Sequence, residues 1–287
     1  MNIFLIGATG YIGSVVAEAL LAAGHSVIGL SRTAEKDQDL RSQGVSPVRA
    51  DLKTPATLLA AAENCDGVIF AGTTNDGPAD IAAIAALLPA HRLLYTSGIW
   101  VMGDTHGQIA DETSPLHPAA IVSWRPEAER LVLAGGGTVI RPAVVFGRAG
   151  GLPLMLVNSA KESGAARYVG DGENRWPLVH VDDLAELYLV ALEKAKPGSL
   201  YLAADLPSCK VREIAEAASY AADAAGHTQS IPLAEARQQY GLLADALVLD
   251  QQVSAEKAKR ELAWKPHGAS VLEELRYGSY AQPRNSP

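Results

Sequence analysis

Cysteine is nearly absent from this sequence of 287 residues, which holds only Cys65 and Cys209. Two cysteines so far apart supply neither the paired spacing of a zinc site nor a disulfide framework. No apolar run reaches the ~18 residues that a membrane-spanning helix requires. The first residues also lack the basic segment and cleavage site of a secretory signal peptide. These absences predict a cytoplasmic protein without a metal site or a membrane partner.

Positive charge is also scarce, because 24 lysines and arginines face 32 aspartates and glutamates, for a formal net charge of -8. No basic stripe offsets this balance, so a nucleic-acid surface is excluded. Apolar residues, in contrast, make up 48% of the chain, enough for one large α/β domain or a domain and a half. We expect a small-molecule substrate and either a monomer or a homodimer.

The stretch from residue 3 to residue 14 joins an apolar run to Gly7, Gly10 and Gly13, and a helical pattern follows. Gly7 lets the chain leave a strand sharply, Gly10 lets the backbone approach a pyrophosphate, and Gly13 lets the helix pack closely. The N–H groups and the dipole of the helix start attract the anion. An ordinary tight turn is the alternative, but strand, glycines and helix in this order favour dinucleotide binding. The same turn supplies three further cofactor-binding candidates, Thr9, Tyr11 and Ile12.

Alternating apolar strands and helical patterns predict a Rossmann-type, doubly wound α/β fold with a parallel sheet. The expected strands are 3–6, 26–30, 45–50, 67–71, 92–96 and 138–141. Residues 1–150 would form the NAD(P)-binding domain, and 151–281 a smaller α+β substrate-binding region in which 170–205 return to the sheet. That region would contain a helix at 152–163, a strand at 178–181 and a helix capped by Asp182. A polar tail, 282–287, would end the chain.

The end of the second expected strand carries Ser31 and Arg32. An acidic residue there would bind the ribose hydroxyls and repel a 2′-phosphate, whereas a hydroxyl and a cation suit the phosphate. A solvated surface arginine is the alternative reading of Arg32. We therefore expect NADP(H) in preference to NAD(H). Small residues at the end of the fourth strand would let the cofactor lie against the sheet, namely Ala71, Gly72 and Thr73.

Several segments in a fixed order carry a family resemblance: 7–13, 51–52, 95–97, 141–147, 179–185 and 258–266. Together they resemble the short-chain dehydrogenase/reductase superfamily in its extended or atypical form, the group that includes NAD-dependent epimerases and dehydratases. The resemblance covers residues 2–267. It implies that Asp51 and Leu52 flank the adenine, and that Pro142, Ala143 and Val144 line the nicotinamide side.

The catalytic Tyr-x-x-x-Lys of that family is missing, because no tyrosine here has a lysine four residues on. Aligning the helix on 125–129 puts Ile121 at the tyrosine position and Arg125 at the lysine position. Arg125 could hold the nicotinamide ribose as a fixed charge but is a poor proton relay. Aligning the fifth strand on 102–103 puts Gly98 at the catalytic hydroxyl position, one residue after Ser97.

Four polar side chains remain as acid–base candidates, namely Ser97, Asp111, Tyr168 and His180. Ser97 could hydrogen-bond a substrate carbonyl or only satisfy backbone groups at the strand end. Of the other three, His180 could be a buried structural histidine, Tyr168 a packing residue and Asp111 a loop cap. Three tryptophans could stack on nicotinamide or an aromatic substrate, or belong to the core: Trp100, Trp124 and Trp176.

Three functions stay open. The first is an NADP(H)-dependent oxidoreductase that acts on a small carbonyl, alkene or imine, with the cofactor carrying the hydride chemistry. The second is a catalytically silent NADP sensor, which the loss of the tyrosine and lysine would also produce. The third is a nucleotide-sugar epimerase or dehydratase with an altered triad, against which the short substrate region counts.

Overall fold

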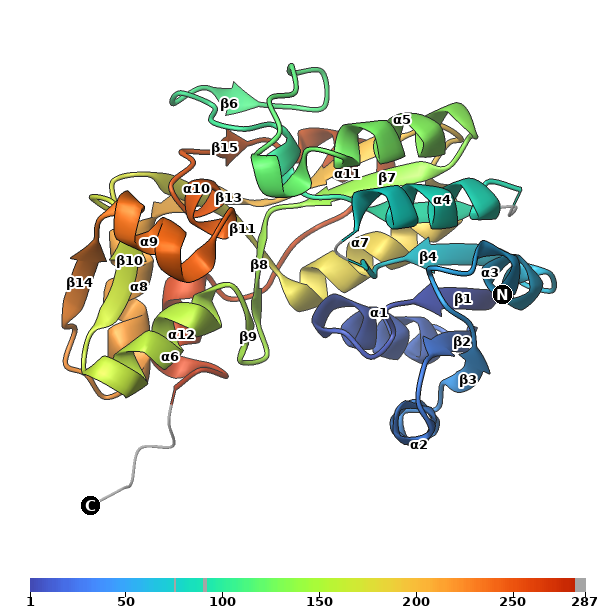
Figure 1. Cartoon of the computed structure of the whole chain (residues 1–287), viewed down its shortest axis with the longest axis horizontal. Helices are drawn as coiled ribbons and strands as arrows, with labels where there is room; N and C mark the ends of the chain where they lie inside the picture. The colour runs from blue at the N-terminus through green and yellow to red at the C-terminus, as the bar shows by residue number, and fades with distance from the viewer. Residues whose placement is uncertain (75, 90–91, 282–287) are drawn as a thin grey trace.

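The computed structural model describes residues 1–281 except 75, 90 and 91 (Figure 1). The polar tail expected at 282–287 therefore lies outside the described residues. Within the described part, no helix combines the length and the apolar character needed to cross a bilayer.

A seven-stranded sheet is formed by strands between residues 2 and 203, in the order β12-β7-β5-β4-β1-β2-β3, with every neighbouring pair parallel. The strands are β1 (Asn2–Ile6), β2 (Ser26–Ser31), β3 (Ser46–Arg49), β4 (Gly67–Phe70), β5 (Leu93–Thr96), β7 (Thr138–Pro142) and β12 (Leu200–Ala203). The strand order reverses between β1 and β4, and ligands of such sheets bind at that switch point. The predicted doubly wound α/β fold is confirmed.

Helices cover both faces of this sheet (Figure 1). One layer contains α1 (Tyr11–Ala22) and α7 (Val181–Lys194), and the other contains α3 (Pro55–Ala62), α4 (Gly77–Leu87) and α5 (Arg125–Ala134). A further helix, α2 (Ala34–Ser42), joins β2 to β3. In β1, Ile3 and Leu5 face the α1 layer, whereas Phe4 and Ile6 face the opposite layer. Burial on both faces explains why the strand is one continuous apolar run.

The later residues build a second core around a four-stranded sheet of order β13-β11-β8-β9. Its strands are β8 (Val144–Gly147), β9 (Gly150–Gly151), β11 (Arg175–His180) and β13 (Asp205–Lys210). The helices that surround it are α6 (Pro153–Ser163), α8 (Val211–Ala221), α9 (Leu233–Tyr240), α10 (Leu243–Leu247) and α12 (Val271–Tyr277). Two small parallel pairs complete the structure, β10 (Ala166–Val169) with β14 (Thr228–Ile231), and β6 (Ile109–Ala110) with β15 (Gln252–Val253). Between β15 and α12 lies α11 (Glu256–Leu262).

Two local expectations differ from the structure around α7. The strand expected at 178–181 is β11, which begins at Arg175 and belongs to the four-stranded sheet, whereas β12 enters the main sheet. The predicted cap Asp182 is wrong, because His180 is the N-cap and its Nδ1 accepts the Asp182 backbone N–H at 3.3 Å. The imidazole thus satisfies a first-turn donor, as a carboxylate cap would. The Asp182 carboxylate instead pairs with Arg148 at 2.8 Å.

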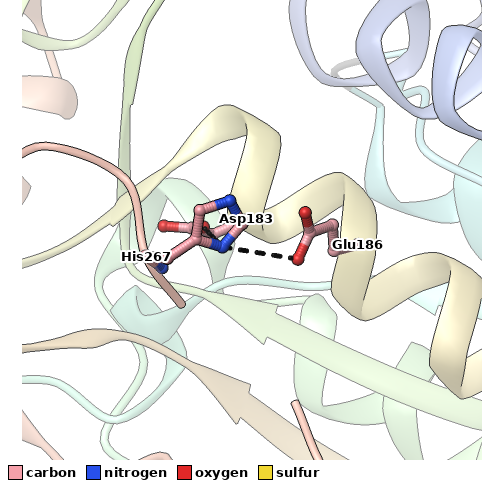
Figure 2. Close-up of side chains that lie close together, drawn as sticks. All are labelled: Asp183, Glu186 and His267. Carbon is pink, nitrogen blue, oxygen red and sulfur yellow. Dashed lines mark hydrogen bonds and ion pairs between the residues drawn. The ribbon is translucent and has the colours of Figure 1, made fainter. Parts of the chain in front are cut away.

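The segment after α11 is tied to α7 through Asp183 (Figure 2). Its carboxylate accepts the backbone N–H of His267 at 2.9 Å and that of Gly268 at 3.0 Å. The His267 Nδ1 lies 3.4 Å from Asp183 and 3.7 Å from Glu186. The Lys265 carbonyl, and then the carboxylates of Glu186 and Asp183, raise the pKa of the His267 imidazole.

Replacing His267 with glutamine is expected to lower the melting temperature near pH 5.5 and to leave it almost unchanged near pH 9. A raised folded-state pKa adds stability that is complete below the unfolded value of ~6.5. That stability is lost as the pH rises through the folded value. Thermal unfolding followed by circular dichroism across this range measures the effect.

His227→Gln is the matched control, because His227 is exposed and lies outside the ion pairs of the described residues. A His267→Gln deficit that is equally large at both pH values would contradict the charge argument.

Candidate active site

Close backbone contacts define the glycine turn between β1 and α1. Gly7 has φ +92°, and a Cβ there would lie 2.7 Å from the carbonyl oxygen of Ala71. A Cβ on Gly13 would lie 2.0 Å from the Gly7 carbonyl oxygen, so no larger residue fits. Gly10 is the N-cap of α1. The first N–H groups of α1 therefore open at the switch point of the sheet, where they suit a phosphate.

An outer cavity of about 870 Å³ runs from the glycine turn to the ends of β2 and β3. Eight of its lining residues were predicted to bind cofactor, namely Gly7, Thr9, Ser31, Arg32, Asp51, Leu52, Gly72 and Thr73. The Ser31 hydroxyl donates to the Thr33 carbonyl at 3.1 Å. Arg32 is exposed and, within the described residues, belongs to no ion pair, whereas Lys36 pairs with Asp39 at 2.8 Å. This arrangement leaves the Arg32 charge available to an anion in the cavity.

An inner cavity of about 280 Å³ lies at the carboxyl ends of β4, β5 and β7 and shares Gly72 and Thr73 with the outer cavity. The structure brings ten predicted residues together in its lining: Ile12, Ala71, Gly72, Thr73, Ser97, Trp100, Arg125, Pro142, Ala143 and Val144. The sequence reasoning missed Thr96, Ile99, Val145, Gly151 and Leu152. Val145 lies in β8 and Gly151 in β9, and Leu152 directly follows the hairpin that these two short strands form.

The three hydroxyl groups of the inner lining are directed to partners outside the lining. Ser97 Oγ donates to Glu129 Oε1 in a short hydrogen bond, and Thr73 Oγ1 donates to Asp80 at 2.6 Å. Thr96 Oγ1 shares a hydrogen bond with the buried Tyr188 hydroxyl. None of the three hydroxyls is thus left without a partner.

Glu129 and Arg141 form a buried ion pair behind Ser97. The Glu129 and Arg141 side chains are 2% and 4% exposed, and their two hydrogen bonds measure 2.9 and 2.6 Å. Glu129 lies four residues after Arg125, on the same face of α5. That spacing was visible in the sequence, but nothing there distinguished buried Glu129 from exposed Glu127.

Arg125 reaches the inner cavity from the first turn of α5. Its Nη1 donates to the Ser97 carbonyl at 2.6 Å, and its guanidinium carbon lies 5.7 Å from the Trp124 ring centroid. Its Nε is buried and has no protein partner among the described residues. A Cβ at Gly98 would lie 2.9 Å from Nη1, so the glycine leaves room for the guanidinium.

Other predicted residues lie outside both linings. The Tyr11 hydroxyl donates to the Gly147 carbonyl at 2.7 Å, and its ring packs against Gly150, so it anchors the β8–β9 hairpin. Burial, which is the largest cause, raises the Tyr11 pKa. Gly10 and Gly13 shape the turn without lining either cavity. Trp124 packs on Gly77 at the start of α4.

The remaining candidates belong to other parts of the structure. Trp176 is 3% exposed, and its indole donates to the Leu247 carbonyl at 3.2 Å. Tyr168 lies in β10 and packs against the same second core. His180 caps α7 and stacks edge-on against Phe146. Asp111 is exposed and accepts the Thr113 backbone N–H at 2.9 Å, as a loop cap does.

One group of side chains has the composition of a metal site, since ligand atoms of Asp183, Glu186 and His267 lie within 4.8 Å of one another (Figure 2). Both Asp183 oxygens already accept backbone N–H groups, and the His267 Nδ1 lies 3.3 Å from the Lys265 carbonyl oxygen. These three side chains are therefore interpreted as an ion-pair cluster that holds the segment after α11 against α7.

Comparisons with known proteins extend these observations. Residues 3–204 match the model of the NAD dependent epimerase/dehydratase family. The chain is 32% identical over 98% of its length to an uncharacterized protein of Schizosaccharomyces pombe, of which it covers 100%. It is 29% identical to an NAD(P)H azoreductase of Xenophilus azovorans, over 82% of this chain and 79% of that protein.

One solved structure resembles this protein over nearly the whole length of both chains. UDP-glucose 4-epimerase of Thermus thermophilus, in complex with NAD, superposes with a TM-score of 0.80. The match covers 98% of this chain and 99% of that chain at 20% sequence identity, and so shows a shared fold.

Replacing Glu129 with glutamine is expected to lower the free energy of unfolding by about 3–5 kcal/mol, because Arg141 would keep a buried charge without its partner. Urea denaturation measures the loss. Adding Arg141→Met to the Glu129→Gln variant should recover part of it, since the unpaired charge is then removed.

Glu127→Gln is the matched control on the same helix. Its partner Arg130 and Glu127 itself are 63% and 49% exposed, so the change should leave the free energy of unfolding almost unchanged. Equal losses in the Glu127 and Glu129 variants would contradict the importance of burial.

Proposed function

Since the chain belongs to the NAD-dependent epimerase/dehydratase family, we propose that it is an oxidoreductase that uses NADP(H) on a small organic substrate. The observation that carries this proposal is the glycine turn opening onto two adjoining cavities at the switch point of the sheet. When bound, the nicotinamide supplies the hydride chemistry, and the protein has to position it. The similarity to an NAD(P)H azoreductase supports an oxidoreductase over a sugar epimerase.

The glycine turn suits the pyrophosphate of such a cofactor. Side chains at Gly7 and Gly13 would collide with the backbone, so the turn keeps a narrow shape beside the N-terminus of α1. The outer cavity would then hold the adenosine end, with Asp51 and Leu52 beside the adenine. The inner cavity would hold the nicotinamide ring, with Arg125 near its ribose.

The preference for NADP(H) rests on Ser31 and Arg32 at the end of β2. Both line the outer cavity, and Arg32 is exposed there without an ion pair in the described residues. A guanidinium binds a phosphate well in this position, whereas ribose hydroxyls would call for a carboxylate.

One observation favours a second function, a protein that binds NADP(H) without turnover. Among the described residues of the inner lining there is no tyrosine, histidine or lysine. Consumption of NADPH with a panel of carbonyl, alkene, imine and azo compounds distinguishes the two functions. Tight binding without turnover on any member of the panel would favour the sensor.

Arg32→Ala is expected to weaken NADPH binding about tenfold or more and to leave NADH binding unchanged. Hydrogen bonds to charged groups contribute about 1.5–3 kcal/mol, and ~1.4 kcal/mol corresponds to a factor of ten. Quenching of tryptophan fluorescence during titration with each cofactor measures both affinities.

Arg41→Ala serves as the control, because Arg41 is exposed in the last turn of α2 and lines neither cavity. If the wild-type protein bound NADH as tightly as NADPH, the role given to Arg32 would be wrong.

A further inference from the structure

Among the described residues, the lining of the inner cavity has one fixed positive charge and no group suited to delivering a proton. From this we infer that its substrate is a conjugated hydride acceptor, such as a quinone or an azo compound. Arg125 stabilises the negative charge that the acceptor gains, and water supplies the proton afterwards. The inference rests on the proposed oxidoreductase function and adds the substrate class.

Three hydroxyl groups line the inner cavity, and each already has a hydrogen-bond partner. Ser97 and Thr73 donate their hydrogens to the carboxylates of Glu129 and Asp80, which are 2% and 0% exposed. A hydroxyl has one hydrogen to donate, so both side chains offer only lone pairs to a ligand. Thr96 and Tyr188 share a hydrogen bond in which either hydroxyl can be the donor, and burial, which is the largest cause, raises the pKa of the Tyr188 phenol, so that this pair is a weak acid. These groups are poor general acids near neutral pH.

Arg125 is the only charged side chain among the described residues of the inner lining. A guanidinium keeps its charge over the whole working pH range and carries five N–H donors. One donates to the Ser97 carbonyl, and the Nε–H is buried without a protein partner in the described part of the chain. The Trp124 ring and the absence of a side chain at Gly98 fix where the guanidinium lies. The guanidinium therefore brings a fixed positive charge to the wall of the inner cavity.

Isolated ketones and conjugated acceptors differ in how they carry the negative charge that a transferred hydride brings. An isolated ketone that gains a hydride becomes a localised alkoxide, a strong base that needs an acid at the moment it forms. A quinone or azo compound would accept a hydride from the dihydronicotinamide, and one π bond of the acceptor would break as the new bond to hydrogen forms. The π electrons spread to a conjugated oxygen or nitrogen, which a preorganised cation stabilises. A proton from water then completes the reduction, so NADPH, acceptor and one proton give NADP⁺ and reduced acceptor.

The lining agrees with a flat, apolar acceptor. Apart from Arg125 and the three engaged hydroxyls, it consists of aliphatic residues, glycines, a proline and Trp100, whose indole offers an aromatic face. An acceptor stacked on the nicotinamide in this space would place its polar atom toward Arg125, the one cation among the described lining residues.

The test measures NADPH oxidation by the protein with 1,4-naphthoquinone, an azo dye or cyclohexanone as the acceptor. We expect turnover of the first two, none of cyclohexanone, and a kcat that is flat between about pH 6 and pH 9. Arg125→Gln should lower kcat roughly 100-fold, the typical effect of removing one donor to a developing anion. Arg125→Lys should retain part of that activity, and Arg130→Gln, an exposed change on the same helix, should retain all of it.

A second measurement does not depend on turnover. The apparent pKa of 4-nitrophenol, followed by absorbance, should fall when the probe binds the protein saturated with NADP⁺, and the shift should vanish in Arg125→Gln. A fall equally large in Arg125→Gln, or no fall in the wild type, would overturn the role of Arg125.

The outcomes separate the two proposals. Turnover of cyclohexanone as fast as naphthoquinone would overturn the inferred substrate class and leave the oxidoreductase standing. An Arg125→Gln variant that raises only the KM for NADPH would assign Arg125 to cofactor binding alone and overturn the inference. Tight NADPH binding with no turnover of any acceptor would overturn the proposed function, and the inference with it.

Discussion

The contact between α1 and the end of β1 is the constraint on which the rest of the site depends. Gly13 lies so close to the Gly7 carbonyl that no side chain fits between them. This contact presses α1 onto the sheet and turns its first N–H groups toward the switch point. Tyr11, on the first turn of that helix, then donates to the Gly147 carbonyl, and Tyr280 donates to the Gly150 carbonyl. The same turn therefore positions a phosphate site and the hairpin that borders the inner cavity.

The departures from the family pattern form one coherent arrangement in space. Gly98 stands where a catalytic hydroxyl is expected, and Arg125 uses the space that a side chain there would fill. Ser97 is held by Glu129, whose charge is balanced by Arg141. Ile121, at the expected tyrosine position, is 36% exposed and lies outside the inner lining. Restoring only the tyrosine would thus leave the rest of the family's machinery absent.

Sequence reasoning located most of the main sheet because buried parallel strands are continuous apolar runs, as residues 3–6 are. It also placed most of the cavity linings, since ligands of this fold lie at strand ends. It failed where local pattern carries no burial signal. Glu129 has the same sequence character as exposed Glu127, and β9 is only Gly150–Gly151. His180 was missed as a cap because its acceptor role depends on tautomer and packing.

If the proposed function is right, the charge arrangement would also decide which substrates react. A site with a general acid accepts many ketones, because the acid neutralises whichever alkoxide forms. A site with only a fixed cation lowers the barrier in proportion to how well the substrate's own π system spreads the new charge. Glu129 contributes by taking the Ser97 hydrogen, since a free hydroxyl there would compete with Arg125 for the same acceptor atom. Desolvation makes a buried ion pair costly, and in the proposed site its effect would be to leave Arg125 as the main polar contact for the substrate.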